Sequence, residues 1–245
     1  MYKKLIAATV AAGLGFSAAV SADIKIIGII QMELVSTSSD TQVDGLTLDD
    51  GARSAIGSGS ASYIGVAGSH DLGNNMTGLY KARFAYSPDD GDTGDGRALK
   101  QKDVFVGLKA EFGTLLAGRM STPYKTSTAK WDPFYTTFLQ ARGANGMSTL
   151  HNGEAANTLA YANTFGAVSF VGAVALDETA ADDHTVIASL NMPMNDSLDL
   201  ALAFLRDSSG DGATAAKLAV KWTGDGNGAV LQYESLDAGL GNLDA

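Results

Sequence analysis

The chain has 245 residues, and its 27 acidic side chains outnumber its 17 lysines and arginines, which gives a formal net charge of -10. Attraction to phosphate requires a basic surface, so no nucleic-acid partner is expected. The chain has no cysteine, which excludes disulfides and cysteine-based metal sites, and its 29 glycines against 4 prolines suit a fold of many strands and turns.

The N-terminus has the pattern of a secretory signal peptide. Lys3 and Lys4 form a basic start, residues 5–16 are apolar, and residues 20–22 (VSA) form a small-residue cleavage site. The apolar run is shorter than the roughly 20 residues that a spanning helix requires. We therefore expect a signal peptide over residues 1–22 and an exported domain over residues 23–245.

From residue 23 onward, apolar and polar residues alternate in segments separated by Gly, Asp, Asn and Ser clusters. In residues 198–206, for example, Leu200, Leu202 and Phe204 occupy every second position and Asp199 lies on the opposite parity. A period of two predicts a β-strand with one apolar face. We expect about eleven strands, over residues 23–36, 61–70, 77–87, 102–111, 114–119, 157–163, 167–177, 184–192, 197–206, 213–223 and 229–236.

Repeated strands of this length behind a secretory signal are typical of an all-β, transmembrane antiparallel β-barrel, whose apolar strand faces contact lipid. An exported soluble β-sandwich or adhesin is an alternative, and it would bury those faces in a central core. A barrel enzyme of the outer membrane is another alternative. It would need a nucleophile and a base converging on one rim, and no such arrangement is visible. We therefore expect no enzyme activity and no cofactor.

The alternation stops between residues 120 and 154. A structureless loop of this length inside a compact domain is uncommon and is usually functional. Its aromatic residues would either stack sugars or pack the loop against the sheet: Trp131, Phe134, Tyr135 and Phe138.

Two acidic segments, residues 89–96 and 207–212, resemble calcium loops. The Glu that an EF-hand requires at its twelfth position is replaced by Gln101 in the first and by Leu218 in the second. Solvated outer loops are therefore expected, with loose divalent bridging to lipopolysaccharide as the alternative. Three histidines on different predicted elements are expected to be surface residues rather than metal ligands: His70, His151 and His184.

Three blocks of sequence stand out along the chain: residues 63–74 (YIGVAGSHDLGN), residues 104–119 (VFVGLKAEFGTLLAGR) and residues 157–166 (NTLAYANTFG). In order and spacing, these blocks resemble the general trimeric porins of Gram-negative bacteria. The first resembles a hairpin of that family, the second the block before its pore loop, and the third the strand after that loop.

The resemblance implies a sixteen-stranded barrel, of which this chain would supply about eleven strands. It implies that the third loop, residues 120–154, folds inward and narrows a pore for passive diffusion of small hydrophilic solutes and ions. It also implies a homotrimer in the outer membrane, in contact with lipid and lipopolysaccharide. Because members of the family end in an aromatic residue, Ala245 indicates an N-terminal portion of a longer barrel.

The resemblance further implies that basic residues of the wall face acidic residues of the loop across the constriction. Tyr63, Ala67 and Glu154 stand where the family commonly has basic residues, while Asp132 adds an acid to the loop. A weak preference for cations is therefore expected. The residues expected to line the constriction or the lumen are Tyr63, Lys81, Arg83, Lys102, Arg119, Asp132, Arg142 and Glu154.

Overall fold

The computed structural model describes residues 23–35, 42–43, 46–47, 51–53, 62–88, 91, 93, 96–137, 139–141, 147–178, 183–208 and 212–237. The predicted signal peptide, residues 1–22, lies outside the described residues, as do Phe138, Arg142 and residues 238–245. No helix in the described part of the chain is long and apolar enough to cross a membrane.

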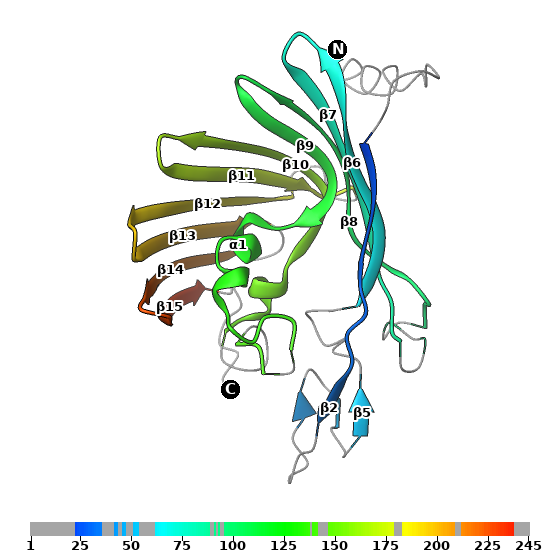
Figure 1. Cartoon of the computed structure of the whole chain (residues 1–245), viewed down its shortest axis with the longest axis vertical. Coiled ribbons are helices and arrows are strands. Elements are labelled where there is room, and N and C mark those ends of the chain that lie inside the picture. The colour runs from blue at the N-terminus through cyan, green and yellow to red at the C-terminus, as the bar shows by residue number, and fades with distance from the viewer. Residues whose placement is uncertain are drawn as a thin grey trace.

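Eleven antiparallel strands form one sheet, in which neighbouring strands follow one another along the chain apart from the step from β1 to β6. Their bounds are β1 (Asp23–Ile29), β6 (Tyr63–Gly73), β7 (Met76–Ala85), β8 (Lys100–Ala110), β9 (Gly113–Ser121), β10 (Glu154–Phe165), β11 (Val168–Leu176), β12 (His184–Asn195), β13 (Leu198–Asp207), β14 (Ala213–Gly224) and β15 (Asn227–Asp237). The predicted number of strands is confirmed. Figure 1 shows that the sheet is strongly curved around the segment between β9 and β10. Among the described residues, β1 pairs only with β6 and β15 only with β14.

The prediction of a single first strand over residues 23–36 is wrong beyond Ile29. The chain leaves the main sheet at Gln31, whose N–H donates to Ser62 Oγ (2.9 Å), while the Ser62 hydroxyl donates to the carbonyl oxygen of Gln31 (3.1 Å). A single hydroxyl thus satisfies both backbone groups where the ladder ends. The chain then forms two small hairpins, one of β2 (Glu33–Val35) with β5 (Gly51–Arg53) and one of β3 (Gln42–Val43) with β4 (Leu46–Thr47).

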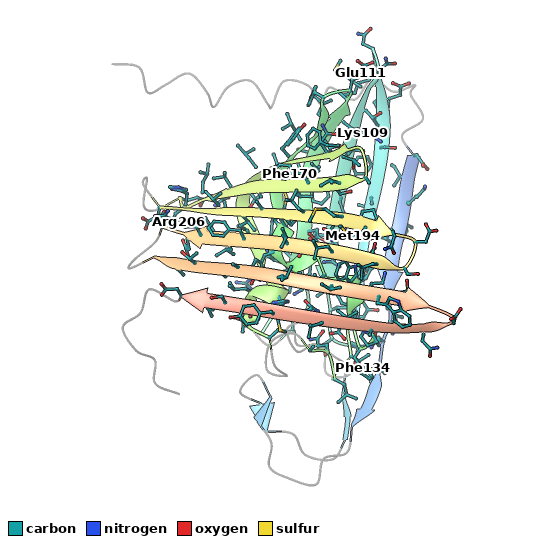
Figure 2. All side chains as sticks on the ribbon, turned by 90° about the vertical axis from the view of Figure 1, so that its left-hand side faces the viewer. Lys109, Glu111, Phe134, Phe170, Met194 and Arg206 are labelled. Atoms are coloured by element: carbon teal, nitrogen blue, oxygen red, sulfur yellow. The ribbon has the colours of Figure 1, made fainter. Side chains whose placement is uncertain are left out.

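The two faces of the sheet differ as the alternation predicts. In β13, Leu202 and Phe204 are 38% and 41% exposed, whereas Ala201 and Ala203 on the other parity are 0% and 6% exposed. Figure 2 views the sheet from the side of β11 to β15, and Phe170 lies on this outer face. Large apolar side chains are also exposed on β1, β6, β10, β14 and β15, so the outer face is apolar across the sheet. A soluble sandwich would bury such a face.

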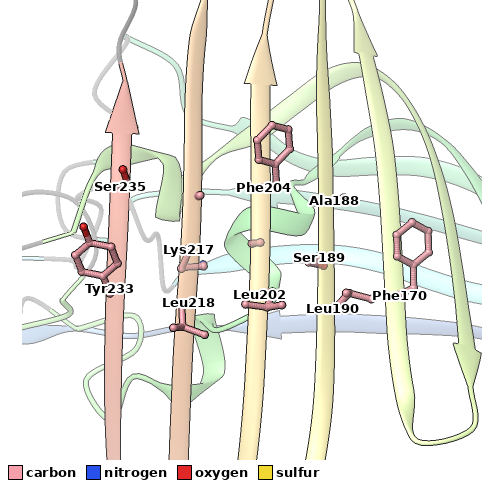
Figure 3. A pocket seen from close by; sticks show the side chains of 12 residues that line it. Phe170, Ala188, Ser189, Leu190, Leu202, Phe204, Lys217, Leu218, Tyr233 and Ser235 are labelled. Atoms are coloured by element: carbon pink, nitrogen blue, oxygen red, sulfur yellow. The ribbon is translucent and has the colours of Figure 1, made fainter.

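The outer face of β11 to β15 carries a shallow, mainly apolar hollow (Figure 3). Ala188 and Ala216 lie opposite Phe204 on the two neighbouring strands, and these methyl groups leave a depression on each side of its ring. Phe170 and Tyr233 also line the hollow. Such a surface suits contact with hydrocarbon.

Short turns connect β6–β7, β8–β9, β10–β11, β12–β13 and β14–β15, and the longer connections alternate with them along the chain. Because successive strands are antiparallel, the short turns lie at one end of the sheet and the longer connections at the other. Asn74 and Asn75 have φ angles of 51° and 59°, which a two-residue type I′ turn requires. The strand predicted over residues 184–192 is longer than expected, because β12 continues to Asn195 and the chain turns at Asp196 and Ser197.

In its described residues, the long irregular segment between β9 and β10 contains helix α1 (Pro123–Thr126) and the 3-10 turns η2 (Ala129–Trp131) and η4 (Thr149–Asn152). Thr122 caps α1, since its Oγ1 accepts from the N–H of Lys125 (3.1 Å), and Pro123 suits the first helical position. The helix packs against β11, β12 and β13 on the concave face (Figure 1). Tyr124 is fully buried there, with Ile187, Leu205 and Ala215 in its cluster. The loop therefore folds inward, as the resemblance implied.

Candidate functional site

An irregular pairing between β7 and β8 helps to create a highly charged region on the concave face. Ala82 pairs with Val104, but Phe84 pairs with Gln101, so Lys102 and Asp103 together oppose the single residue Arg83. This is a β-bulge, which places two residues of one strand opposite one residue of its neighbour and re-aims their side chains. The side chains of Lys102 and Asp103 consequently both lie near Arg83, although the two residues are consecutive in the strand.

Asp103 holds two of the predicted basic residues. Its Oδ2 lies 3.0 Å from Lys81 Nζ and 2.9 Å from a terminal guanidinium nitrogen of Arg83. Its Oδ1 accepts from the N–H of Ser121 (2.8 Å) and from the Ser121 hydroxyl (2.9 Å). Four donors thus fix this buried carboxylate between β7 and β9.

Glu154, at the start of β10, lies close to three further basic side chains. Its Oε2 lies 3.4 Å from Lys102 Nζ and 3.5 Å from Arg119, and its Oε1 lies 3.2 Å from Lys125 Nζ. Arg83 is 4.0 Å away and lies between the two carboxylates. Because Lys125 belongs to α1, Glu154 joins the loop to the sheet.

We call these seven residues the basic cluster: Lys81, Arg83, Lys102, Asp103, Arg119, Lys125 and Glu154. Five cationic side chains surround two carboxylates, so the cluster has an excess of positive charge. The Lys81 and Arg119 side chains are each 30% exposed, whereas both carboxylates are 6% exposed. The charge that the cluster presents to the space beside the loop is therefore positive.

The structure brings together five of the residues that the sequence singled out: Lys81, Arg83, Lys102, Arg119 and Glu154. Tyr63 lies beside the cluster, with its ring centre 5.1 Å from the Arg83 guanidinium carbon, as in a cation–π contact. Asp132 is buried, and its carboxylate accepts from the N–H groups of Phe134 (2.8 Å) and Ala141 (2.8 Å), so it shapes the loop. Arg142 lies outside the described residues.

Asp103 and Lys125 also belong to the basic cluster, although the sequence did not indicate them as site residues. Strict alternation places Asp103 opposite to Lys102 in parity, and only the bulge brings both side chains to one cluster. Lys125 lies in a segment without periodicity, so its partner Glu154, 29 residues later, was not predictable from spacing. The alternation did indicate Lys81 and Arg83, which share one face of β7.

His151 is not the surface residue that the sequence suggested. It is 1% exposed, its ring packs edge-on against Tyr124 with centroids 5.4 Å apart, and its Nε2 lies 3.2 Å from Glu234 Oε1. Within the described residues, no group of three or more His, Asp or Glu side chains is arranged to hold a metal ion. Trp131 lies beneath Lys221 Nζ (5.9 Å to the ring centre), which packs this aromatic residue of the loop against the sheet.

Comparisons with known proteins agree with this architecture. A family model described as Gram-negative porin matches residues 7–244. The chain is similar to the major outer membrane protein P.IB of Neisseria gonorrhoeae, with 34% identity over 129 residues that cover 53% of this chain and 35% of that protein. It is also similar to an outer membrane porin protein of Bordetella pertussis, with 27% identity over 172 residues that cover 66% of this chain and 43% of that protein.

Among solved structures, the fold is similar to that of an anion-selective porin from Comamonas acidovorans. The TM-score is 0.58 and the identity 18%, with 89% of this chain and 80% of that chain covered. The segments aligned with the two relatives above span less than half of their lengths. Because the family model matches nearly the whole chain, the chain belongs to the Gram-negative porin family, whose place is the outer membrane.

Proposed function

We propose that this chain forms the wall and the constriction of a water-filled channel through which small hydrophilic solutes and ions diffuse passively. The observation that carries the proposal is the basic cluster, in which wall strands and the inward-folded loop bring charged side chains together on the concave face. The opposite face of the same strands is apolar and exposed. A polar interior and an apolar exterior are what a channel through a bilayer requires.

The proposed assembly is a homotrimer that contacts outer-membrane lipid and lipopolysaccharide. The resemblance of three sequence blocks to general trimeric porins supports it. Chemical cross-linking of the full-length protein in outer-membrane vesicles tests it, and a ladder that stops at three subunits is the expected result. A ladder that stops at one subunit would contradict the trimer.

For ion selectivity, the geometry supports a modest preference for anions. Fixed charges that line a narrow passage raise the local concentration of ions of opposite sign. The weak cation preference predicted from the sequence depends on Glu154 and Asp132 facing the lumen. Here the Glu154 carboxylate lies beneath four basic side chains, and that of Asp132 accepts two backbone hydrogen bonds.

The reversal potential of the full-length channel under a salt gradient decides between the two signs. We expect a potential of the anion-selective sign, which shifts toward zero in Lys125→Gln because that variant removes one positive charge from the cluster. The preference should also weaken above about 0.1 M salt, where screening acts within about 10 Å. A potential of the cation-selective sign would refute this assignment, and the absence of any conductance would refute the channel.

A further inference from the structure

Two residues of the last strands of the sheet hold the loop, at a distance along the sheet from the basic cluster on β7 to β10. Lys217 of β14 and Glu234 of β15 are directly paired in the sheet. Lys217 Nζ donates to the carbonyl oxygen of Tyr124 (2.5 Å) and to Thr128 Oγ1 (3.0 Å), and it lies 4.5 Å from the centre of the Tyr124 ring. Lys217 therefore holds α1 and the turn that follows it.

Glu234 contacts both ends of the loop. Its Oε1 accepts from the hydroxyl of Tyr124 (2.7 Å) in α1 and from the hydroxyl of Ser148 (2.7 Å), just before η4. Its Oε2 accepts from the N–H of Ser148 (3.0 Å), and His151 Nε2 lies 3.2 Å from Oε1. Burial and the bond to the carboxylate raise the pKa of the Tyr124 hydroxyl, which therefore remains a donor at neutral pH.

These contacts are buried. Lys217 is 3% exposed, Tyr124 is fully buried, and Ile187, Leu205 and Ala215 pack around Tyr124. Charge-assisted hydrogen bonds in such surroundings are stronger than in water, and they require a defined geometry. The directional hydrogen bonds of Lys217 and Glu234 therefore favour one arrangement of the loop groups that they contact.

Tyr124 and Lys125 are consecutive residues of the same helical turn, and they have partners on different parts of the sheet. Tyr124 binds Glu234 of β15, whereas Lys125 binds Glu154 of β10. With Thr122 capping the turn, α1 connects the two contacts through a short stretch of backbone. Holding Tyr124 in place therefore restricts where the Lys125 ammonium can lie.

We propose that Lys217 and Glu234 are positioning residues of the constriction, which hold α1 so that Lys125 meets Glu154 within the basic cluster. This inference rests on the proposed channel function for its electrical test, while a chemical test of the loop contact is independent of conduction. Release of either residue should let α1 leave the wall and remove Lys125 from the cluster.

The chemical test uses thiol labelling, because these 245 residues contain no cysteine. Ser127 is buried at the end of α1, and its carbonyl oxygen accepts from Asn191 Nδ2 (2.7 Å), so Ser127→Cys places a thiol beneath the loop. In a full-length, single-cysteine protein, we expect Glu234→Gln to accelerate reaction with a membrane-impermeant maleimide about tenfold, the factor that loss of one charge-assisted hydrogen bond gives.

The matched control is Glu111→Gln, which makes the same change at a carboxylate in the short turn between β8 and β9, where its Oε1 accepts from Asn75 Nδ2 (3.0 Å), outside the loop between β9 and β10. Its labelling rate should equal that of the parent. Tyr124→Phe should also accelerate labelling, and Tyr124→Phe combined with Glu234→Gln should give less than the product of the single effects, because both remove the same hydrogen bond. If Glu234→Gln does not assemble, the labelling rate of Tyr124→Phe, which removes only one hydroxyl, is the measurement that decides.

The electrical test asks whether Lys125 depends on the two positioning residues. The shift in reversal potential that Lys125→Gln causes should shrink in the Glu234→Gln background. Parental labelling rates in both Tyr124→Phe and Glu234→Gln would overturn the inference. Equal acceleration in Glu111→Gln, or a full Lys125→Gln shift in the Glu234→Gln background, would overturn it as well. A protein that does not conduct would refute the channel, and the labelling rates would still decide the loop contact.

Discussion

At the scale of single residues, two carboxylates organise the basic cluster. Asp103 fixes Lys81 and Arg83, and Glu154 gathers the basic side chains of β8, β9 and α1. Both are more deeply buried than the cations that they hold, so their negative charge contributes less to the surface than the positive charge around them. Their role in the proposed channel is to position the basic side chains rather than to attract permeating cations.

Removing the charge of Asp103 should therefore strengthen the anion preference. In Asp103→Asn, the amide still accepts a hydrogen bond from Ser121, but Lys81 and Arg83 lose their anionic partner. We expect the reversal potential to move further in the anion-selective direction, and the loss of the charge-assisted bonds to cost about 1.5–3 kcal/mol of stability. The control Asp199→Asn leaves the basic cluster intact and should shift the potential less. A shift of Asp103→Asn toward cations would contradict this role.

At the scale of an element, β13 shows how one strand serves two environments. Leu202 and Phe204 are exposed on the outer face, while Ala203 and Leu205 are buried beneath the loop. On the inner parity, the small alanine side chains leave room for α1 and Leu205 packs against Tyr124, while the large side chains on the outer parity suit hydrocarbon. Because side chains alternate with a period of two, a one-residue shift of register would reverse both faces at once.

A charge should therefore be tolerated on one face of β13 and not on the other. Leu202→Arg places a charge on the outer face near the middle of the strand, where we expect it to destabilise the assembled protein by about 2–4 kcal/mol. Asp199→Arg, on the inner face and 34% exposed, should assemble normally because water and ions solvate it. The measurement is the yield of heat-modifiable, folded protein in outer-membrane fractions. Equal yields of both variants would show that the assignment of the faces is wrong.

At the scale of the whole molecule, the curved sheet and the inward-folded loop have different roles. The sheet separates an apolar exterior from a charged interior, and the loop occupies part of the interior. Membership of the Gram-negative porin family sets aside both the exported sandwich and the barrel enzyme that the sequence left open. The full number of strands in the barrel remains a prediction.

If the loop narrows the pore, shortening it should widen the passage. Replacing residues 123–152 of the full-length protein by a short turn removes α1, η2 and η4 together, and we expect the single-channel conductance to rise and the anion preference to fall, because Lys125 is lost with the loop. A deletion within the connection between β11 and β12, which is not part of the loop, is the control and should leave both values near those of the parent. An unchanged conductance after loop replacement would contradict the proposed constriction.

The sequence by itself determined the elements whose signal is local. Alternation with a period of two predicted eleven strands and their outward faces, since the side-chain direction in a strand follows from the backbone at each residue. The grouping of Lys81, Arg83, Lys102, Arg119 and Glu154 into one site came from the resemblance of the sequence blocks to general trimeric porins and not from the alternation. The sequence did not reveal the end of β1 at Ile29, because the hydrogen bonds between Gln31 and Ser62 leave no mark on the alternation of apolar residues.

Tertiary structure decided how those charges are arranged. The bulge at Lys102 and Asp103 depends on the partner strand, because a ladder can accommodate an extra residue only opposite a neighbour. The path of the loop depends on contacts such as that of Tyr124 with Glu234, which are 110 residues apart in the chain. No periodicity encodes such contacts, and they determine which charges the proposed passage meets: Glu154 and Asp132 are covered, whereas Lys81 and Arg119 of the basic cluster remain partly exposed.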